Sequence, residues 1–177
     1  MHQLRPCVFF DRDGIVNKPP LGRYVERPED FEILPEFLAA LCLICERGYE
    51  AVIVTNQKGI ATGEITPEAL MEIHRVLIET VLRHNLRLLD IRISTTADDT
   101  DPDRKPNPGL LLGAAHEHGL DLHRSWMIGD RARDMEAGRR AGCRTVLVGA
   151  HTSPNADFHV ASMSALVDFL RQHLDFV

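Results

Sequence analysis

The segment VFFDRDGIV, residues 8–16, places two carboxylates, Asp11 and Asp13, two positions apart directly after a run of apolar residues. A strand can end this way in an ordinary surface turn, because Asp and Gly are common turn residues. Paired carboxylates can also serve as a nucleophile and as a general acid and base. The rest of the sequence has to decide between a turn and a reactive site.

Short apolar runs alternate along the chain with longer amphipathic segments, which predicts strands that alternate with helices. The predicted strands lie near residues 7–11, 51–55, 90–95, 125–129 and 144–148, and the predicted helices near 35–47, 67–84, 108–118, 132–141 and 164–174. Strands connected through helices pair in parallel by right-handed crossovers. The pattern therefore predicts an α/β fold: a doubly wound (Rossmann-like) parallel sheet flanked by helices, in a single domain over residues 1–177.

Polar residues stand at the ends of several predicted strands. Asp11 and Asp13 follow the first strand, and Thr55 ends the second. Lys105 lies in the segment after the third strand, and Asp130 follows the fourth. Because ligands bind beyond the carboxyl ends of the strands in such sheets, we expect these side chains to meet at one edge.

Three carboxylates in one place raise one another's pKa unless a cation lies between them. Oxygen ligands in this number suit Mg²⁺, which also shares the oxygens of a substrate phosphate. Together with Lys105, the set suits phosphoryl transfer, which depends on positioning and on charge stabilisation. Asp11 can attack phosphorus and form an aspartyl phosphate, while Asp13 protonates the leaving alcohol and then activates the hydrolytic water.

The chain resembles the haloacid dehalogenase-like phosphatase superfamily over most of its length, with four motifs in order: FFDRDG, VTNQ, RKPNPG and IGDRARDMEAG. The resemblance implies that Asp11 is nucleophile and metal ligand, and that Asp13 is acid and base with its main-chain carbonyl on Mg²⁺. It implies that Thr55 and Lys105 hold the phosphoryl oxygens and that Asp130 is the remaining metal ligand. The short intervals between the motifs leave no room for a large cap domain.

Within the superfamily, the chain looks closest to phosphatases acting on D-glycero-D-manno-heptose 1,7-bisphosphate and on histidinol phosphate, through DRDGIVN, GRYVERPEDFEILP, VTNQKGIATGEIT and DRKPNPG. This closer resemblance implies that Asn56 also binds phosphate. The substrate-binding residues that it implies are Gly22, Arg23, Tyr24, Gln57, Lys58, Arg104 and Arg131. Arginines among them can grip a second phosphate or hydroxyl groups. Asp134, on the helix after Asp130, is expected to orient the site rather than to bind metal.

These features predict a Mg²⁺-dependent phosphatase for a small sugar phosphate, best matched by the heptose bisphosphate hydrolysed at its 7-phosphate through an aspartyl-phosphate intermediate. A histidinol-phosphate phosphatase is the nearest alternative in chemistry. A non-catalytic phosphosugar-binding module is an alternative of another class. The presence of both Asp11 and Asp13 argues against it, because a binder does not need two carboxylates facing a phosphate.

One stretch departs from the resemblance. Relatives usually carry a zinc loop of three cysteines and a histidine before the RKP motif, but here that stretch is STTADDTDPDRKP, without Cys or His. We therefore expect no structural zinc, and the resemblance implies that the loop which shapes substrate specificity in relatives is absent here. Cys42 and Cys45 form a CxxC inside a predicted helix, where two core-facing thiols explain them better than a metal or redox pair.

Composition limits the partners. The net charge is −6 and the isoelectric point is near 5.8, so no basic surface points to nucleic acid. No apolar stretch is long enough to cross a bilayer, and the N-terminal MHQLRPC lacks the apolar part of a signal peptide. We expect a cytoplasmic protein whose partner is a small phosphate ester, with no nucleic acid or membrane partner and with its oligomeric state left open.

Overall fold

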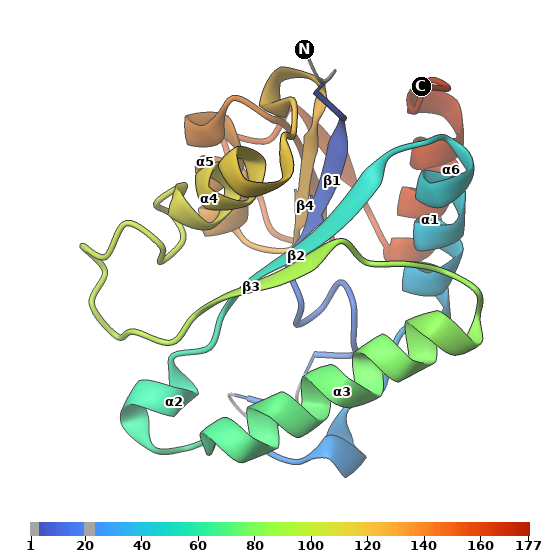
Figure 1. Ribbon diagram of the computed structural model, residues 1–177. Coiled ribbons are helices and arrows are strands. Elements are labelled where there is room, and N and C mark those ends of the chain that lie inside the picture. The colour runs from blue at the N-terminus through green and yellow to red at the C-terminus, as the bar shows by residue number, and fades with distance from the viewer. Residues whose placement is uncertain (1–3, 20–23) are drawn as a thin grey trace.

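The computed structural model describes residues 4–19 and 24–177. Within these ranges, six parallel strands form one sheet in the order β3-β2-β1-β4-β5-β6 (Figure 1). The strands are β1 (Cys7–Phe10), β2 (Glu50–Asn56), β3 (Asp90–Ser94), β4 (Trp126–Gly129), β5 (Arg144–Val148) and β6 (Phe158–Val160). The prediction of a doubly wound, parallel α/β sheet is confirmed.

Helices cover both faces of this sheet. They are α1 (Pro35–Glu46), α2 (Gly59–Thr62), α3 (Pro67–Arg83), α4 (Gly109–His118), α5 (Ala132–Ala141) and α6 (Met163–His173), with short 3₁₀ turns η1 (Pro28–Asp30) and η2 (Leu122–Arg124). One face packs against α1, α3 and α6, and the other against α4 and α5 (Figure 1). Because both faces are covered, β1 is buried along its whole length, as its unbroken apolar run predicts.

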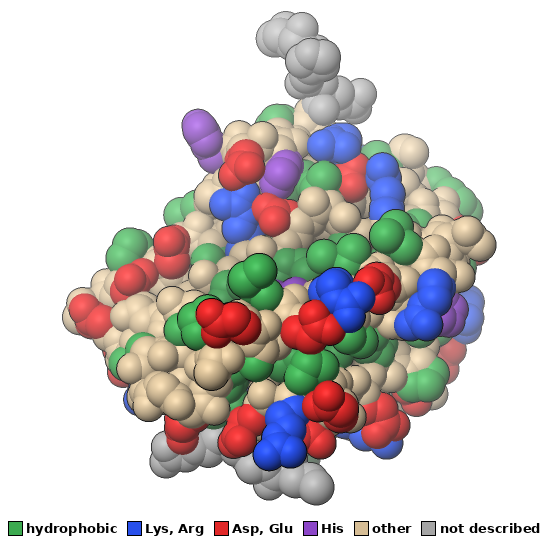
Figure 2. Space-filling view, turned by 60° about the horizontal axis from the view of Figure 1, so that its bottom comes forward, with side chains coloured by type: hydrophobic (Ala, Val, Ile, Leu, Met, Phe, Trp, Pro, Cys, Tyr) green, Lys and Arg blue, Asp and Glu red, His purple; other side chains and the backbone are tan. Residues whose placement is uncertain are grey.

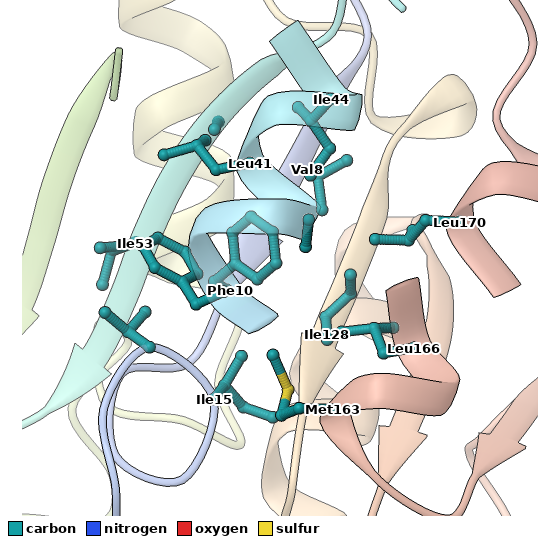
Figure 3. Close-up of a cluster of buried hydrophobic side chains, with 14 of the residues drawn as sticks. Val8, Phe10, Ile15, Leu41, Ile44, Ile53, Ile128, Met163, Leu166 and Leu170 are labelled. Atoms are coloured by element: carbon teal, nitrogen blue, oxygen red, sulfur yellow. The ribbon is translucent and has the colours of Figure 1, made fainter. Parts of the chain in front are cut away.

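Side chains of β1 alternate between two apolar cores, as the period of a strand requires. Val8 and Phe10 point into the core under α1 and α6 (Figure 3). The ring of Phe10 packs edge-on against the ring of Phe37, with 5.4 Å between the ring centres. Cys7 and Phe9 point into the core under α4 and α5. Packing on both sides fixes β1, and so fixes the position of the acid that follows it.

The chain between the motifs adds no large cap. Within the described residues between 13 and 105, the regular elements are only η1, α1, β2, α2, α3 and β3. The predicted absence of a large cap domain is therefore confirmed for the part of the chain that the structure describes. No helix among the described residues has both the length and the apolar character that crossing a bilayer needs.

Neither the short strand β6 nor the short helix α2 was predicted. β6 has three residues with mostly exposed side chains, so it lacks the apolar run that marks the other strands. α2 is a single helical turn that ends at Gly63, where φ is +74°. The expectation of two core-facing thiols is only partly right, because Cys42 and Cys45 are both half-buried, and the Sγ atom of Cys42 donates to Glu46.

Helix α3 begins as the sequence predicts: the hydroxyl of Thr66 accepts from the N–H of Ala69 at 3.1 Å, and Pro67 takes the first helical position. Its outer side carries exposed apolar residues, Met71, Ile78 and Leu82. Figure 2 shows apolar side chains gathered on this face among acidic and basic ones. Its inner side packs toward the sheet and brings His74 to the loop after β1.

Candidate active site

Four of the predicted site residues, Asp11, Thr55, Lys105 and Asp130, lie at or near the carboxyl ends of β1, β2 and β4. The chain builds β2 and β3 on one side of β1 and β4 to β6 on the other, so the winding direction changes between β1 and β4. Asp11 follows β1 directly, and its N–H donates to the carbonyl of Ile128 in β4 at 2.9 Å. This is the position at which open α/β sheets bind ligands.

Lys105 forms the centre of the cluster. Its Nζ atom donates to Asp11 Oδ1 at 2.8 Å and to the carbonyl of Val54 at 2.7 Å, and it lies 2.7 Å from Asp134 Oδ1. The side chain is fully buried. Burial alone would lower the pKa of Lys105, but the carboxylates of Asp11 and Asp134 outweigh it and raise the pKa above its usual value. Lys105 is therefore a cation beside the predicted nucleophile.

Asp134 is held from two sides in a fully buried position. Its Oδ2 atom accepts from the N–H of Arg131 at 3.0 Å, at the start of α5, while Oδ1 faces Lys105. A Cβ atom on Gly129 would lie 2.4 Å from the Cβ of Asp134, so only glycine at this point of β4 allows the approach. These contacts agree with the expected orienting role of Asp134.

Three carboxylates lie together here. One oxygen from each of Asp11, Asp130 and Asp134 lies within 4.8 Å of the others, and no other such group of metal-ligating side chains occurs among the described residues. Burial, with the nearby Asp134 carboxylate, raises the pKa of Asp11 to about 7, although Lys105 opposes the rise. Burial and Asp134 likewise raise the pKa of Asp130. The carboxylate forms of Asp11 and Asp130 therefore need a further cation to stabilise their charge.

These residues fit a hard divalent cation such as Mg²⁺. The Oδ1 atom of Asp130 is buried and has no hydrogen-bond partner among the described residues. A buried carboxylate oxygen without a partner is costly, and a metal ion satisfies it. The glycine after Asp13 keeps this side of the cluster open, because a Cβ atom on Gly14 would lie 2.8 Å from Asp130 Oδ2.

The side chain of Asp13 does not join the carboxylate cluster but lies beside it in a set of donors. The guanidinium of Arg12 donates to both of its oxygens, at 2.9 and 3.0 Å. The amide of Asn17 donates to Oδ1 at 3.0 Å, and the amide of Gln57 donates to Oδ2 at 3.1 Å. The side chain keeps 24% of its surface exposed, so it can exchange protons with a bound substrate or water.

Thr55 and Asn56, at the end of β2, contact residues on both sides of them in the site: Gln57, which holds Asp13, and Lys105. The buried hydroxyl of Thr55 accepts from Gln57 Nε2 at 2.8 Å, which leaves its own proton free to donate to a phosphoryl oxygen. The side chain of Asn56 forms hydrogen bonds with both the N–H and the carbonyl of Lys105, at 3.1 and 2.9 Å. In this structure Asn56 therefore fastens the Lys105 loop to β2, and its role as a phosphate ligand stays a prediction.

A polar pocket of about 300 Å³ adjoins the cluster, lined by Tyr24, Asn56, Lys58, Arg104 and Arg133. Arg104 is nearly buried, and its guanidinium donates to Asp99 Oδ1 at 2.7 Å and to the carbonyl of Thr96 at 3.1 Å. Neither Lys58 nor Arg133 forms a salt bridge with an acid among the described residues, although the charge of Lys58 acts on Asp99 and that of Arg133 on Asp130. The pocket therefore carries an excess of positive charge, although the chain as a whole is acidic.

Other predicted substrate residues lie elsewhere. Arg131 is exposed at the start of α5, where its guanidinium contacts His151 at 2.7 Å and lies 3.4 Å from Asp130 Oδ2. Gln57 is fully buried under Asp13 and Thr55 rather than in the pocket. Gly22 and Arg23 lie outside the described residues. The roles of Arg131, Gln57, Gly22 and Arg23 stay predictions.

Sequence reasoning missed two basic residues of this site. Arg133 lines the pocket, and the available signal was its place on the first turn of the helix that follows Asp130. Arg12 holds Asp13, and the signal was a charged residue between two acids at the end of an apolar strand. Neither position by itself tells which way the side chain points.

Known proteins similar to this chain show the family to which it belongs. The HAD-hydrolase-like family model matches residues 103–171. The D-glycero-D-manno-heptose-1,7-bisphosphate 7-phosphatase of Thermosynechococcus vestitus is 31% identical over 96% of this chain and 97% of its own length. The D-glycero-beta-D-manno-heptose-1,7-bisphosphate 7-phosphatase of Helicobacter pylori is 32% identical over 93% of this chain and 97% of its own.

A solved structure shares the fold of this chain. The crystal structure of the D,D-heptose 1,7-bisphosphate phosphatase from B. bronchiseptica, complexed with magnesium and phosphate, superposes with a TM-score of 0.83. The two chains are 26% identical, and the superposition covers 94% of this chain and 98% of the other. The likeness therefore extends over nearly the whole of both chains.

Proposed function

Because this chain belongs to the haloacid dehalogenase-like family of the D-glycero-D-manno-heptose-1,7-bisphosphate 7-phosphatases, we propose that it removes the 7-phosphate of this heptose bisphosphate. The chain is a phosphatase, a phosphoric monoester hydrolase. One observation supports the assignment of its chemistry most directly: Asp11, the buried Lys105 and the carboxylate pair Asp130 and Asp134 meet at one point of the sheet edge, with Asp13 beside them.

In the proposed first step, a carboxylate oxygen of Asp11 attacks phosphorus, and the bond from phosphorus to the sugar oxygen breaks. Asp13 gives the leaving oxygen its proton. Lys105, held 2.8 Å from Asp11, lies where it can neutralise the charge on the phosphoryl oxygens. The hydroxyl of Thr55 donates to the same group.

In the proposed second step, water attacks the phosphorus of the aspartyl phosphate. Asp13, now a carboxylate, takes a proton from this water, and the bond between Asp11 and phosphorus breaks. Inorganic phosphate leaves, and both acids return to their starting forms. Asp11 and Asp130, with the main-chain carbonyl of Asp13, would hold Mg²⁺, which would supply positive charge to the carboxylates and to the phosphoryl group.

The pocket of Lys58, Arg104 and Arg133 suits the part of the substrate that is not cleaved. A bisphosphate carries a second dianionic group, and arginines bind phosphate through paired charge-assisted hydrogen bonds. This pocket therefore favours a bisphosphate over histidinol phosphate, whose second end is cationic at neutral pH. The charge of the pocket is our reason for ranking the two substrates in this order.

Metal dependence is the first test. Activity should be lost after treatment with EDTA and should return on addition of Mg²⁺, because the three carboxylates need a cation to remain charged together. Elemental analysis of the purified protein should show no stoichiometric zinc, since the loop before Arg104 has no Cys or His. One tightly bound zinc per chain would contradict our interpretation of that loop.

Substrate choice is the second test. With Mg²⁺ present, kcat/KM should rank the heptose bisphosphate above histidinol phosphate and above an aryl phosphate, and ³¹P NMR should show release of the 7-phosphate. Arg104→Ala should lower kcat/KM for the bisphosphate by roughly 10- to 150-fold, the equivalent of about 1.5–3 kcal/mol for one charge-assisted hydrogen bond. The same variant should change hydrolysis of the aryl phosphate little.

Two further variants complete this experiment. Arg133→Ala should act as Arg104→Ala does, because both side chains line the pocket. Arg139→Ala is the matched control: it removes an exposed arginine from the same helix, paired with Asp157 away from the pocket, and should leave both substrates unaffected. A higher kcat/KM for histidinol phosphate, or equal losses on both substrates for Arg104→Ala, would overturn the bisphosphate assignment.

A further inference from the structure

Arg12 is an unusual residue to find where it lies. It stands between Asp11 and Asp13, and its side chain has no exposed surface at all. Arginine is rarely buried so completely unless it is paired, because removing its charge from water is costly. The proposed mechanism gives Arg12 no part, so its burial needs an explanation of its own.

The guanidinium of Arg12 is held by three separate parts of the chain. Its Nε atom donates to Asp13 Oδ1 at 3.2 Å and its Nη2 atom donates to Oδ2 at 3.0 Å, a fork of two nitrogens that holds the carboxylate in one plane. Its Nη1 atom lies 3.5 Å from Nε2 of His74 on α3. Its Cζ atom lies 5.7 Å from the ring centre of Phe31, just after η1.

His74 is suited to receive this contact. It is nearly buried, and burial together with the charge of Arg12 lowers the pKa of His74 to about 4. The ring is therefore neutral at physiological pH. Because a guanidinium has no acceptor atom, the Nε2 atom of the neutral ring must accept from Arg12. Helix α3 thus supports Arg12 from the side opposite to Asp13.

We propose that Arg12, supported by His74 and Phe31, is a positioning residue that holds the carboxyl group of Asp13 in the orientation for proton transfer. Without the fork, the side-chain donors that remain on Asp13 among the described residues are the single amides of Asn17 and Gln57, one to each oxygen. Single donors allow a carboxyl group to rotate. Proton transfer requires hydrogen-bond reach to the leaving oxygen, so a rotating Asp13 would be a weaker acid catalyst.

This inference rests on the proposed role of Asp13 as general acid, and the test must separate the two. The value of kcat/KM reports only the steps up to departure of the alcohol. A sugar alkoxide leaves poorly and needs the proton of Asp13, whereas 4-nitrophenolate leaves readily without it. Arg12 does not line the pocket of Lys58, Arg104 and Arg133. A change on substitution of Arg12 in the ratio of kcat/KM for the heptose bisphosphate to kcat/KM for 4-nitrophenyl phosphate therefore reports acid catalysis by Asp13.

Arg12→Met should lower this ratio by at least about 10-fold, a part of the roughly 10²- to 10⁴-fold that general acid catalysis supplies. Arg12→Lys keeps the buried charge but lacks the fork, so it should lower the ratio by a smaller factor, roughly 3- to 5-fold. Arg139→Ala, measured beside them, should leave the ratio unchanged. Circular dichroism and melting curves show whether each variant is folded.

Asp13→Asn, measured in parallel, distinguishes an error in the proposed acid role of Asp13 from an error in the proposed positioning role of Arg12. If Asp13→Asn leaves the ratio unchanged, the proposed acid role of Asp13 is wrong, and the inference about Arg12 is overturned with it. If Asp13→Asn lowers the ratio but folded Arg12→Met affects both substrates equally, Arg12 has a structural role only. If Arg12→Met does not fold, Arg12→Lys decides: a lowered ratio supports the proposal, and an unchanged one overturns it.

Discussion

Replacement of Asp11 by asparagine should lower kcat by on the order of 10⁴- to 10⁶-fold and leave the fold intact, as expected for removal of a covalent nucleophile. An amide nitrogen or oxygen does not form the aspartyl phosphate at a useful rate. The fold should tolerate the change because Lys105 keeps its contact with Asp134 and its bond to the carbonyl of Val54. Removal of one of three clustered carboxylates also relieves like-charge repulsion.

Steady-state rates with an aryl phosphate and a melting curve test this prediction, and mass spectrometry checks that the asparagine has not reverted to aspartate. Asp168→Asn, which changes an exposed acid of α6, is the control and should retain full activity. In wild-type protein, acid quenching during turnover should trap a phosphoprotein that hydroxylamine cleaves. Turnover by folded Asp11→Asn within 100-fold of wild type would contradict the covalent mechanism.

Replacement of Lys105 by methionine should lower kcat/KM by roughly 10²- to 10³-fold for every phosphate ester, since all of them present the same phosphoryl group. It should also destabilise the metal-free protein by about 3–5 kcal/mol. The reason for the second effect is burial: Lys105 is the cation between Asp11 and Asp134, and without it two buried carboxylates face each other. Denaturant unfolding in EDTA measures the loss.

A double variant separates stability from catalysis. Lys105→Met combined with Asp134→Asn removes one buried charge of each sign and should recover at least half of the lost stability, without recovery of activity. If Lys105→Met lost activity on the bisphosphate but not on the aryl phosphate, Lys105 would bind the distal part of the substrate rather than the phosphoryl group that is cleaved. An unchanged unfolding free energy for Lys105→Met would show that the buried ion pairs are not stabilising.

The strand ends were predictable because their signal is local. An apolar run followed by FFDRDG or IGDRARD shows where a buried strand stops, and parallel strands bring their carboxyl ends to one edge. From this rule, the meeting of Asp11 and Asp130 follows without any knowledge of the loops, whereas Lys105 lies in the loop between β3 and α4 that Asn56 holds against β2. β6 escaped prediction for the same reason: its three residues are mostly exposed and carry no apolar pattern.

The environment of the charged side chains was not predictable in this way. The sequence places Arg12 next to Asp13, but its burial depends on His74 of α3 and on Phe31, which lie far along the chain. The pocket likewise combines Lys58 after β2 with Arg104 before α4 and Arg133 on α5. Sequence periodicity reports the regular structure within one helix or strand. It does not report contacts between elements that are far apart in the chain.

By itself, then, the sequence determined the α/β fold and which acids lie at the strand ends, because strand periodicity and strand-end motifs are local properties of the chain. Only the tertiary structure decided how those acids are charged and held. It placed Asp134 against Lys105, turned Asp13 toward Arg12, and bound Arg104 to Asp99. The pKa and orientation of a buried charged group depend on every group packed around it. The packing of distant helices against one sheet determines which groups these are.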